Sequence, residues 1–377
     1  MSGSDMRALV MPKWGLTMTQ GVVVQWLVDE GADVEQGAEL LDVETEKILS
    51  AVESPATGVL RRQVAAEGST LPVGGLLGVI ADADVADEAV DGFAATFEAE
   101  FTPEAEAEAG EGPSPQQVDV DGHSLRYLKM GEGGEPAVLV HGFGGDLNNW
   151  LFNHEALSAD RAVYALDLPG HGESSKNVGD GTVGSLAQVV AGFMDAQGLP
   201  PAHLVGHSLG GAIAAELAGA APDRVRSLTL IASVGLGREF RPGFLDGFAT
   251  ARRRRQIKPV LDALFADPAL VTRRLVNEVL QYKRLDGVEE ALTAIARDLV
   301  ADGQQTVSIR DRLATYPGRV LVIWGGADQI VPASHAAGLP DGMHVEVIDA
   351  VGHMPMMEAS ARVNQVLAAQ FEGRLSA

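Results

Sequence analysis

From Val118 to the C-terminus, the sequence alternates apolar strand-like runs with glycine-rich turns and helix-like segments. The runs are PAVLVHGFGG, RAVYALDLPGHGES, AHLVGHSLGGAIAAELA, VRSLTLIAS and RVLVIWGGADQIVP. Because strands that alternate with helices need crossover connections, this order predicts a parallel sheet covered by helices. Residues 234–300 interrupt the alternation with helix-like sequence, which predicts a helical insertion.

The N-terminal segment contains an internal repeat with an offset of 37 residues. The repeated glycines are Gly21 and Gly58, Gly31 and Gly68, and Gly37 and Gly74. Short alternating strands between turn glycines predict a small two-sheet β module over residues 5–81. Lys47 falls at the junction of the two halves, near the bend of a predicted hairpin, where its side chain would be exposed.

Residues 82–117 are rich in aspartate and glutamate and contain no lysine or arginine. This composition predicts an acidic, flexible linker that is extended by self-repulsion. Within it, Phe93, Phe97 and Phe101 recur at helical spacing. The stripe fits either a short helix that rests on one of the domains, which we favour, or a docking site for a partner enzyme.

The overall composition excludes several classes of protein. The chain has 377 residues, no cysteine and a formal charge of -24. The lack of cysteine excludes disulfides and thiolate metal sites, and the negative charge argues against nucleic acid or an anionic membrane as a partner. We expect a cytoplasmic protein without a membrane span, and no metal, because no His/Asp/Glu cluster has metal-ligand spacing.

The sequence GHSLG at residues 206–210 follows a predicted strand and precedes a small-residue helix, which is the context of a serine nucleophile elbow. A serine hydroxyl needs a base, and the base needs an orienting acid. Asp328 follows the strand RVLVIWGG, and His353 lies in VGHMPMMEAS. Asp349 is a rival acid but precedes the histidine by only four residues. We therefore predict a Ser208, Asp328 and His353 triad.

An oxyanion formed at the serine needs two backbone donors. The sequence HGFGG after the strand AVLV supplies one loop, so the N–H groups of Phe143 and Leu209 are the predicted donors. His141 and His207 are alternative bases, but each lies within a turn. We interpret both, and Asp167 in LDLPGHGES, as residues that shape loops.

The N-terminal segment resembles the lipoyl domains of 2-oxoacid and acetoin dehydrogenase complexes. In that family the lipoylated lysine lies in an E-T-D-K-A turn that S-P-x-x-G follows. Here the corresponding sequences are ETEKI at residues 44–48 and SPATG at residues 54–58. Related biotinyl carriers have methionine on both sides of the lysine, whereas Lys47 has Glu46 and Ile48. The resemblance implies lipoate on Lys47, attached by a lipoate ligase.

Residues 118–377 resemble the α/β-hydrolase family, in which residues 234–300 would correspond to the lid. The lid contains the strongest basic cluster of this acidic chain, in the run ARRRRQIK. We favour a solvated helix face for this cluster, while contacts to the phosphates of coenzyme A remain the alternative. The arginines concerned are Arg252, Arg253, Arg254 and Arg255.

The two domains together resemble the acetoin dehydrogenase complex dihydrolipoyllysine-residue acetyltransferases that have a hydrolase-like C-terminal domain. The resemblance implies a thiamine diphosphate-dependent dehydrogenase and a dihydrolipoamide dehydrogenase as partner subunits. It also implies acetyl transfer from lipoyl-Lys47 to coenzyme A, for which acyl-Ser208 is a hypothetical intermediate. The D-H-R-x-x-D-G signature of the usual transferase domain and the small subunit-binding domain are absent from the sequence.

Two other functions stay open at this point. The C-terminal domain can be a serine hydrolase of an ester, thioester or carbon-carbon bond that is fused to an independent carrier. The chain can also be a carrier and scaffold with a vestigial triad. The sequence does not decide whether water or coenzyme A is the second nucleophile.

Overall fold

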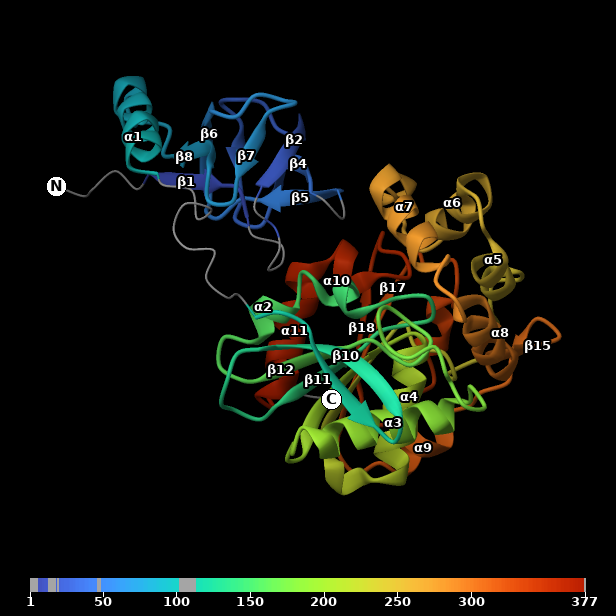
Figure 1. Cartoon of the computed structure of the whole chain (residues 1–377). Helices are drawn as coiled ribbons and strands as arrows, with labels where there is room; N and C mark the ends of the chain where they lie inside the picture. The colour runs from blue at the N-terminus through green and yellow to red at the C-terminus, as the bar shows by residue number, and fades with distance from the viewer. Residues whose placement is uncertain (1–5, 13–17, 19, 46–48, 102–112, 376–377) are drawn as a thin grey trace. The chain divides into compact units, whose positions relative to one another are not determined.

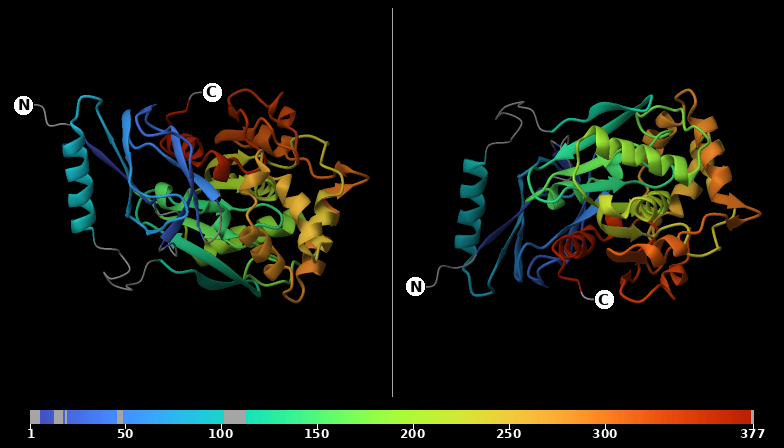
Figure 2. Two further views of the ribbon diagram at one scale, coloured as in Figure 1. Left: turned by 90° about the horizontal axis from the view of Figure 1, so that it is seen from above. Right: turned by 90° about the horizontal axis from the view of Figure 1, so that it is seen from below.

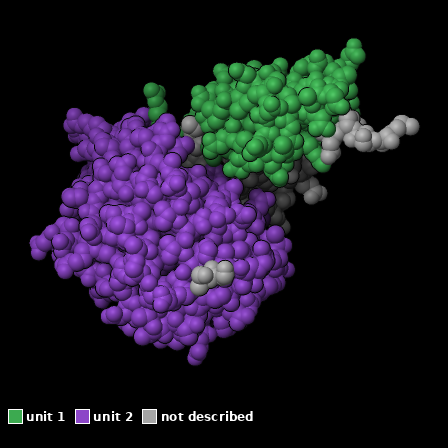
Figure 3. Space-filling view, turned by 180° about the vertical axis from the view of Figure 1, so that it is seen from behind, with its two compact units in different colours: residues 1–112, 272–275 green, residues 113–271, 276–377 purple. Residues whose placement is uncertain are grey.

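The chain forms two compact units, which Figure 3 colours separately. The computed structural model describes residues 6–12, 18, 20–45, 49–101 and 113–375. The first unit contains residues 1–112 and 272–275, and the second contains residues 113–271 and 276–377. Each unit has its own hydrophobic core. Among the described residues, no helix has the length and apolar character needed to cross a membrane.

Two four-stranded antiparallel sheets make up most of the N-terminal unit (Figure 1). The strands are β1 (Arg7–Val10), β2 (Gln20–Trp26), β3 (Asp33–Val34), β4 (Glu39–Glu44), β5 (Leu49–Glu53), β6 (Gly58–Gln63), β7 (Thr70–Pro72) and β8 (Leu76–Ala81). Their order is β1-β8-β6-β3 in one sheet and β5-β4-β2-β7 in the other. The predicted two-sheet β module is confirmed.

The structure explains why glycine recurs at an offset of 37 residues. A Cβ atom on Gly21 would lie 2.7 Å from Val43 Cγ1, and one on Gly58 would lie 3.0 Å from Ile80 Cγ2. Val43 and Ile80 are themselves 37 positions apart, so each half of the repeat makes the same close approach. Four turn glycines adopt a positive φ at this offset: Gly31 (87°), Gly68 (81°), Gly37 (85°) and Gly74 (80°).

Strands β4 and β5 flank Lys47 in the sequence. They pair antiparallel, with Glu44 opposite Leu49. Lys47 belongs to the connection between these paired positions and lies outside the described residues. The flanking strands β4 and β5 therefore pair as the predicted hairpin requires, as far as Glu44 and Leu49.

Part of the expected linker over residues 82–117 is a helix, α1 (Asp87–Glu100), that belongs to the N-terminal unit. Val90 of this helix is fully buried, and Phe93 and Phe97 pack against the cluster formed by β8. The Phe97 and Phe101 rings stack with their centroids 6.1 Å apart. The aromatic stripe thus rests on the carrier-like unit, as the favoured interpretation expected.

Ion pairs also hold α1 on this unit. Arg61 and Arg62 on β6 pair with Asp87 and Asp91 at 2.8 Å and 2.7 Å. The prediction of a continuous linker is therefore wrong for α1, because the apolar stripe and two distant arginines outweigh the acidic composition. Residues 102–112, the rest of the acidic part, lie outside the described residues.

An eight-stranded sheet forms the centre of the C-terminal unit. The strands are β9 (Gln116–Val120), β10 (His123–Met130), β11 (Ala137–Val140), β12 (Val163–Leu166), β13 (Ala202–His207), β14 (Val225–Ile231), β17 (Arg319–Gly325) and β18 (His344–Ile348). Their order is β18-β17-β14-β13-β11-β12-β10-β9. The strands from β18 to β12 run parallel, and β10 and β9 are antiparallel to their neighbours.

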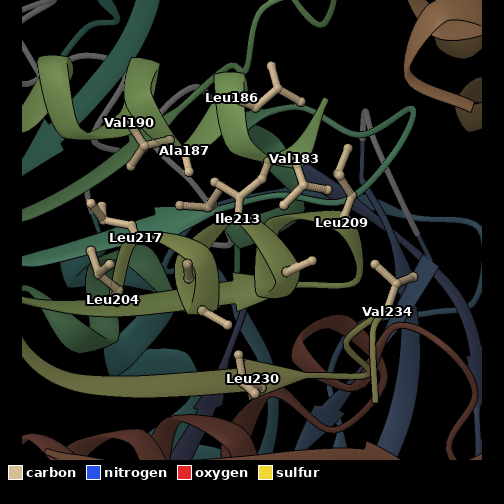
Figure 4. Close-up of a cluster of buried hydrophobic side chains, with 14 of the residues drawn as sticks. Val183, Leu186, Ala187, Val190, Leu204, Leu209, Ile213, Leu217, Leu230 and Val234 are labelled. Atoms are coloured by element: carbon tan, nitrogen blue, oxygen red, sulfur yellow. The ribbon is translucent and has the colours of Figure 1, made fainter. Parts of the chain in front are cut away.

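Helices cover both faces of this sheet (Figure 2). They are α2 (His154–Leu157), α3 (Val183–Ala196), α4 (Leu209–Ala220), α9 (Arg310–Thr315), α10 (Pro355–Glu358) and α11 (Ser360–Phe371), with the 3-10 turns η1 (Leu147–Trp150), η2 (Pro222–Arg224) and η4 (Ala333–Ala336). Helices α3, α4 and α9 lie on one face, and α2 and α11 lie on the other. Ile213 of α4 packs between Val190 of α3 and Leu204 of β13 in the core (Figure 4).

A helical insertion separates β14 from β17, in the interval expected to form a lid. It contains α5 (Phe244–Thr250), α6 (Arg254–Asp262), η3 (Pro268–Leu270), α7 (Arg273–Tyr282), α8 (Val288–Leu299) and the short strands β15 (Val300–Ala301) and β16 (Gln304–Gln305). Helices α6 and α7 carry arginines on one side and buried Ile257, Leu261, Val276 and Leu280 on the other. This amphipathic pattern is typical of surface helices.

Candidate active site

Ser208 lies in the single-residue turn between β13 and α4. Its backbone has φ 52° and ψ -114°, a conformation that costs a non-glycine residue about 1–3 kcal/mol. A Cβ atom on Gly206 would lie 2.1 Å from Gly210 O, and one on Gly210 would lie 2.2 Å from Val140 O. Only glycine fits at both positions, so GHSLG forms a tight elbow that directs the serine away from the sheet.

Ser208 and the two predicted partners lie in one hydrogen-bonded series. His353 Nε2 is 3.1 Å from Ser208 Oγ, and His353 Nδ1 is 2.7 Å from Asp328 Oδ2. The three residues come from three different segments of the chain, and their side chains are all buried. Distances of this size are those of a nucleophile, a base and an orienting acid.

The carboxylate of Asp328 is held by backbone groups as well as by the histidine. Its Oδ1 accepts hydrogen bonds from the N–H groups of Ile330 at 2.8 Å and Val331 at 3.0 Å. Because Oδ2 accepts from His353 Nδ1–H, the Nε2 lone pair of His353 is left to face the serine hydroxyl. Asp349, the rival acid, is exposed and makes no hydrogen bond to His353.

The predicted oxyanion donors lie beside the serine. Gly142 is so close that a Cβ atom on it would be 3.0 Å from Ser208 Cβ, so the HGFGG backbone passes next to the nucleophile. Leu209 N–H is the first amide of α4, where helical amides have no acceptor in their own helix. Within the described residues, neither Phe143 N–H nor Leu209 N–H donates a hydrogen bond. Both amides are free to bind a developing oxyanion.

His141 and His207, the alternative bases, have structural contacts. His141 donates through Nδ1 to Gly142 O at 2.8 Å and accepts through Nε2 from Leu168 N at 3.0 Å. His207 Nε2–H donates to the carbonyl of His353 at 2.8 Å. Burial lowers the pKa of His141 to about 4 and the pKa of His207 well below its usual value. Neither ring contacts the serine hydroxyl as a base.

Asp167 shapes the loop after β12. Its Oδ1 accepts from Leu147 N at 2.7 Å, and its Oδ2 accepts from Glu173 N at 2.9 Å. Burial, the largest effect, and the nearby charge of Asp146 raise its pKa to about 6. This carboxylate joins two loops and has no contact with the Ser208 series.

Glu358, a residue that we did not single out from the sequence, binds the loop of the candidate base. Its Oε1 accepts from the backbone N–H groups of Gly352 at 3.0 Å and Met354 at 3.3 Å, on either side of His353. Its Oε2 accepts from Ala266 N in the insertion at 2.8 Å. The acid in VGHMPMMEAS was a visible signal, but its partner at residue 266 is remote in the sequence.

An aromatic side chain of the insertion covers the oxyanion loop. The rings of Phe143 and Phe248 meet edge to face with centroids 5.8 Å apart, and a Cβ atom on Gly144 would lie 2.3 Å from the Phe248 ring. Lys283 donates to the carbonyls of Phe248 and Ala249 and lies over the Phe248 ring. Helix α5 is thereby held against the loop that contains Phe143.

The basic cluster at residues 252–255 is partly engaged within the insertion. Arg252 binds Glu289 at 2.7 Å, and Arg254 binds Asn277 at 2.7 Å. Arg253 and Arg255 are exposed on the same helical turn. Half of the cluster is therefore committed to neighbouring side chains, as expected for a solvated helix face. In the described part of the chain, no group of three acidic or histidine side chains could hold a metal.

Comparison with known proteins agrees with this architecture. Residues 7–80 match the family model described as "Biotin-requiring enzyme", and residues 136–360 match the "alpha/beta hydrolase fold" model. The dihydrolipoyllysine-residue acetyltransferase component of the acetoin cleaving system of Pseudomonas putida is 50% identical over 97% of this chain and 98% of its own. The component of the same name from Cupriavidus necator is 48% identical over 95% of this chain and 96% of its own.

A solved structure supports the assignment of the second unit. The meta-cleavage product hydrolase from Pseudomonas fluorescens IP01 superposes with a TM-score of 0.63. It is 25% identical and covers 69% of this chain and 98% of its own. Together with the family model that matches residues 136–360, this similarity shows that the second unit has a hydrolase-like framework.

Proposed function

The chain belongs to the family of dihydrolipoyllysine-residue acetyltransferase components of acetoin cleaving systems, and from this premise we propose that Ser208 carries the acetyl group in transit. The chain is an acyltransferase with a lipoyl-type carrier domain, uses coenzyme A as its co-substrate and works with other subunits of its system. A thiamine diphosphate-dependent dehydrogenase and a dihydrolipoamide dehydrogenase are the proposed partners.

The observation that carries the proposal is the continuous series from Ser208 Oγ through His353 to Asp328. A serine hydroxyl without a base is a poor nucleophile, and such a series serves covalent catalysis. The free amides of Phe143 and Leu209 next to it supply the matching stabilisation of negative charge. A chain that acted only as a carrier would need none of these groups.

In the proposed first step, Ser208 Oγ attacks the carbonyl carbon of an acetyl thioester while His353 Nε2 takes the hydroxyl proton. The carbonyl oxygen becomes an oxyanion bound by the two amides, and Asp328 stabilises the imidazolium. Collapse breaks the carbon–sulfur bond, and His353 returns its proton to the departing thiolate. The products are acetyl-Ser208 and a free thiol.

In the second step, the thiol of coenzyme A gives its proton to His353, and its sulfur attacks acetyl-Ser208. The same amides hold the second oxyanion. Collapse breaks the ester bond and returns the proton to Ser208 Oγ, which leaves acetyl-CoA and the starting enzyme. The two half-reactions exchange one thioester for another, so no redox partner is needed.

Lipoate on Lys47 supplies, when attached, the thiol that brings the acetyl group as a thioester. The pairing of Glu44 with Leu49 brings the two flanks of Lys47 together, which is compatible with a modified lysine between β4 and β5. The neighbours Glu46 and Ile48 lack the methionines that biotinyl carriers have at this turn. The proposed attachment residue is therefore Lys47, with lipoate as the group.

Single-turnover mixing of lipoyl-acetylated protein with coenzyme A tests the role of the serine. We expect acetyl-CoA from wild type, a loss of several orders of magnitude in Ser208→Ala, and full activity in the surface control Ser158→Ala. Equal formation of acetyl-CoA by Ser208→Ala would refute the acyl-serine route and leave direct thiol attack. Acetate as the main product at saturating coenzyme A would instead identify a hydrolase, like the superposed meta-cleavage product hydrolase.

A further inference from the structure

The segment that leaves β14, residues 232–242, connects the nucleophile to the loop of the candidate acid. Val234 N donates to Ser208 O at 3.2 Å, and Arg241 N donates to Ile330 O at 2.9 Å. Ile330 N in turn binds the Asp328 carboxylate. We call residues 232–242 the connecting segment. It begins at the candidate active site and remains attached to it at its far end.

Gln305 keeps the connecting segment in place. This side chain is buried, accepts from Gly235 N at 2.6 Å and donates to Glu239 O at 2.7 Å, while its backbone N–H donates to Arg238 O at 2.8 Å. These three hydrogen bonds to Gln305 hold the backbone of the connecting segment in one position.

Two hollows adjoin the connecting segment. One, of about 610 Å³, lies between Gly235–Arg238 and residues 301–310. The other, of about 430 Å³, lies between Glu239–Pro242 and the residues just after Asp328. The two hollows share no lining residue but follow one another along the same short segment, and we call the pair the arginine groove. Volumes of this size accommodate small-molecule ligands.

Three arginines of the groove carry charges without acidic partners. Arg310 donates only to carbonyls, those of Leu236, Ala337 and Gly338. Arg241 donates to the neutral amide of Gln329 at 3.2 Å, and Arg238 is exposed. In the part of the chain that the structure describes, none of the three pairs with a carboxylate. By contrast, Arg226, Arg252 and Arg312 of the same unit all do.

The acids of the groove offset only part of this charge. Glu239 lines the smaller hollow and is hydrogen-bonded to His335 Nε2 at 2.8 Å, and Asp302 lines the larger hollow. Ser308 adds an exposed hydroxyl to the same hollow. In a chain with a formal charge of -24, three guanidinium groups and two carboxylates around the two hollows leave the groove with a net positive charge. Guanidinium groups and hydroxyls together are the donors that phosphate groups prefer.

We propose that the arginine groove binds the phosphate groups of coenzyme A, an inference that rests on the proposed transfer to this thiol. Arg238 is four residues from Val234, whose amide binds Ser208 O, so the backbone between them spans at most about 14 Å. The flexible arm between the phosphates and the thiol of coenzyme A bridges a separation of that size. The groove is an alternative phosphate site to the cluster at residues 252–255, for which we favoured a solvated helix face.

The test begins with binding alone, using adenosine 3′,5′-bisphosphate, the nucleotide part of coenzyme A, and the full chain in calorimetry. We expect saturable binding that weakens with salt and loses about tenfold or more in affinity in Arg238→Glu and in Arg241→Glu. Arg284→Glu reverses a comparable exposed charge and should bind as wild type does. If the wild-type chain does not bind the bisphosphate, or if all three variants lose the same affinity, the groove is not the phosphate site.

Kinetics then separates this proposal from the proposed function. If wild type makes acetyl-CoA, the groove variants should raise KM for coenzyme A about tenfold with little change in kcat. If KM is unchanged in the groove variants but raised in the double variant Arg253→Glu/Arg255→Glu, the phosphate site lies on α6 and not in the groove. The proposed acetyl transfer would not be affected by that result. If wild type releases only acetate but still binds the bisphosphate at the groove, the transfer mechanism fails and the binding site remains. Unfolding midpoints of all variants check that each is folded.

Discussion

Replacement of Glu358 by glutamine tests whether the loop of His353 is positioned from outside the triad. The carboxylate binds Gly352 N and Met354 N through one oxygen and Ala266 N through the other. In Glu358→Gln the side chain keeps its size, but an NH2 group replaces one oxygen. Whichever way the amide turns, at least one backbone N–H then faces another donor.

The expected magnitude follows from these three bonds. Hydrogen bonds to a charged group contribute about 1.5–3 kcal/mol each, and a buried donor left without an acceptor costs about 1–3 kcal/mol. Burial raises the pKa of Glu358, so removal of its charge recovers part of this loss. We expect a net loss of about 1–3 kcal/mol in the free energy of unfolding. A displacement of His353 by about 1 Å would lower turnover on the order of 100-fold.

The assay is the rate of Ser208 labelling by a fluorophosphonate, together with kcat and KM, measured well below the unfolding temperature of the variant. The control Glu155→Gln changes an exposed glutamate on α2 and should match wild type in both. A purely structural role for Glu358 would lower the unfolding midpoint but leave labelling and kcat unchanged. That result would refute our reasoning about His353.

Three further predictions concern the carrier, the base and acid stability. Peptide mapping of protein from its native host should find lipoate on Lys47, and lipoate on Lys13 instead would contradict the assignment. Labelling of Ser208 by a fluorophosphonate should be suppressed in His353→Ala, because the hydroxyl loses its base. If labelling is lost in His207→Ala but persists in His353→Ala, His207 is the base instead. Burial is the largest cause that lowers the pKa of three histidines to about 4: His141, His154 and His203. Between about pH 6.5 and 4 these three histidines bind more protons in the unfolded chain, while Asp167, whose pKa burial raises to about 6, binds about one more in the folded chain. Through these four groups, stability should fall by about 3 kcal/mol per pH unit as pH decreases there. Urea midpoints that stay constant from pH 7 to 5 would contradict this.

The features predicted from the sequence share a local signal. The repeat made the two-sheet unit predictable because each half contains the same close contact. Gly21 packs against Val43, and Gly58 packs against Ile80, in each case 22 residues later. Ser208 was visible because a strand, two glycines and a helix must follow one another in the chain to form the elbow. Backbone geometry of this kind depends on consecutive residues, so it can be predicted from a short stretch of sequence.

The features that were missed depend on residues far apart in the sequence. Acidic composition suggested a linker, but Asp87 and Asp91 pair with Arg61 and Arg62, which lie 26 and 29 positions earlier in the sequence. Glu358 was likewise not singled out, because nothing near it in the sequence indicated that Ala266 N would lie 2.8 Å from its carboxylate. Pairing across the fold, rather than propensity, decides the role of such charged residues.

The helical insertion is part of the framework of the candidate active site and not only its cover. Each of the three loops that supply the Ser208, Asp328 and His353 side chains is bonded to it through the backbone. The bonds run from Val234 N to Ser208 O, from Arg241 N to Ile330 O, and from His353 N to Leu264 O. Each is worth about 0.5–1.5 kcal/mol, so a hinge motion of the whole insertion would cost all three and displace the triad with them. The attached ends of the insertion therefore keep the nucleophile, the acid and the base in register.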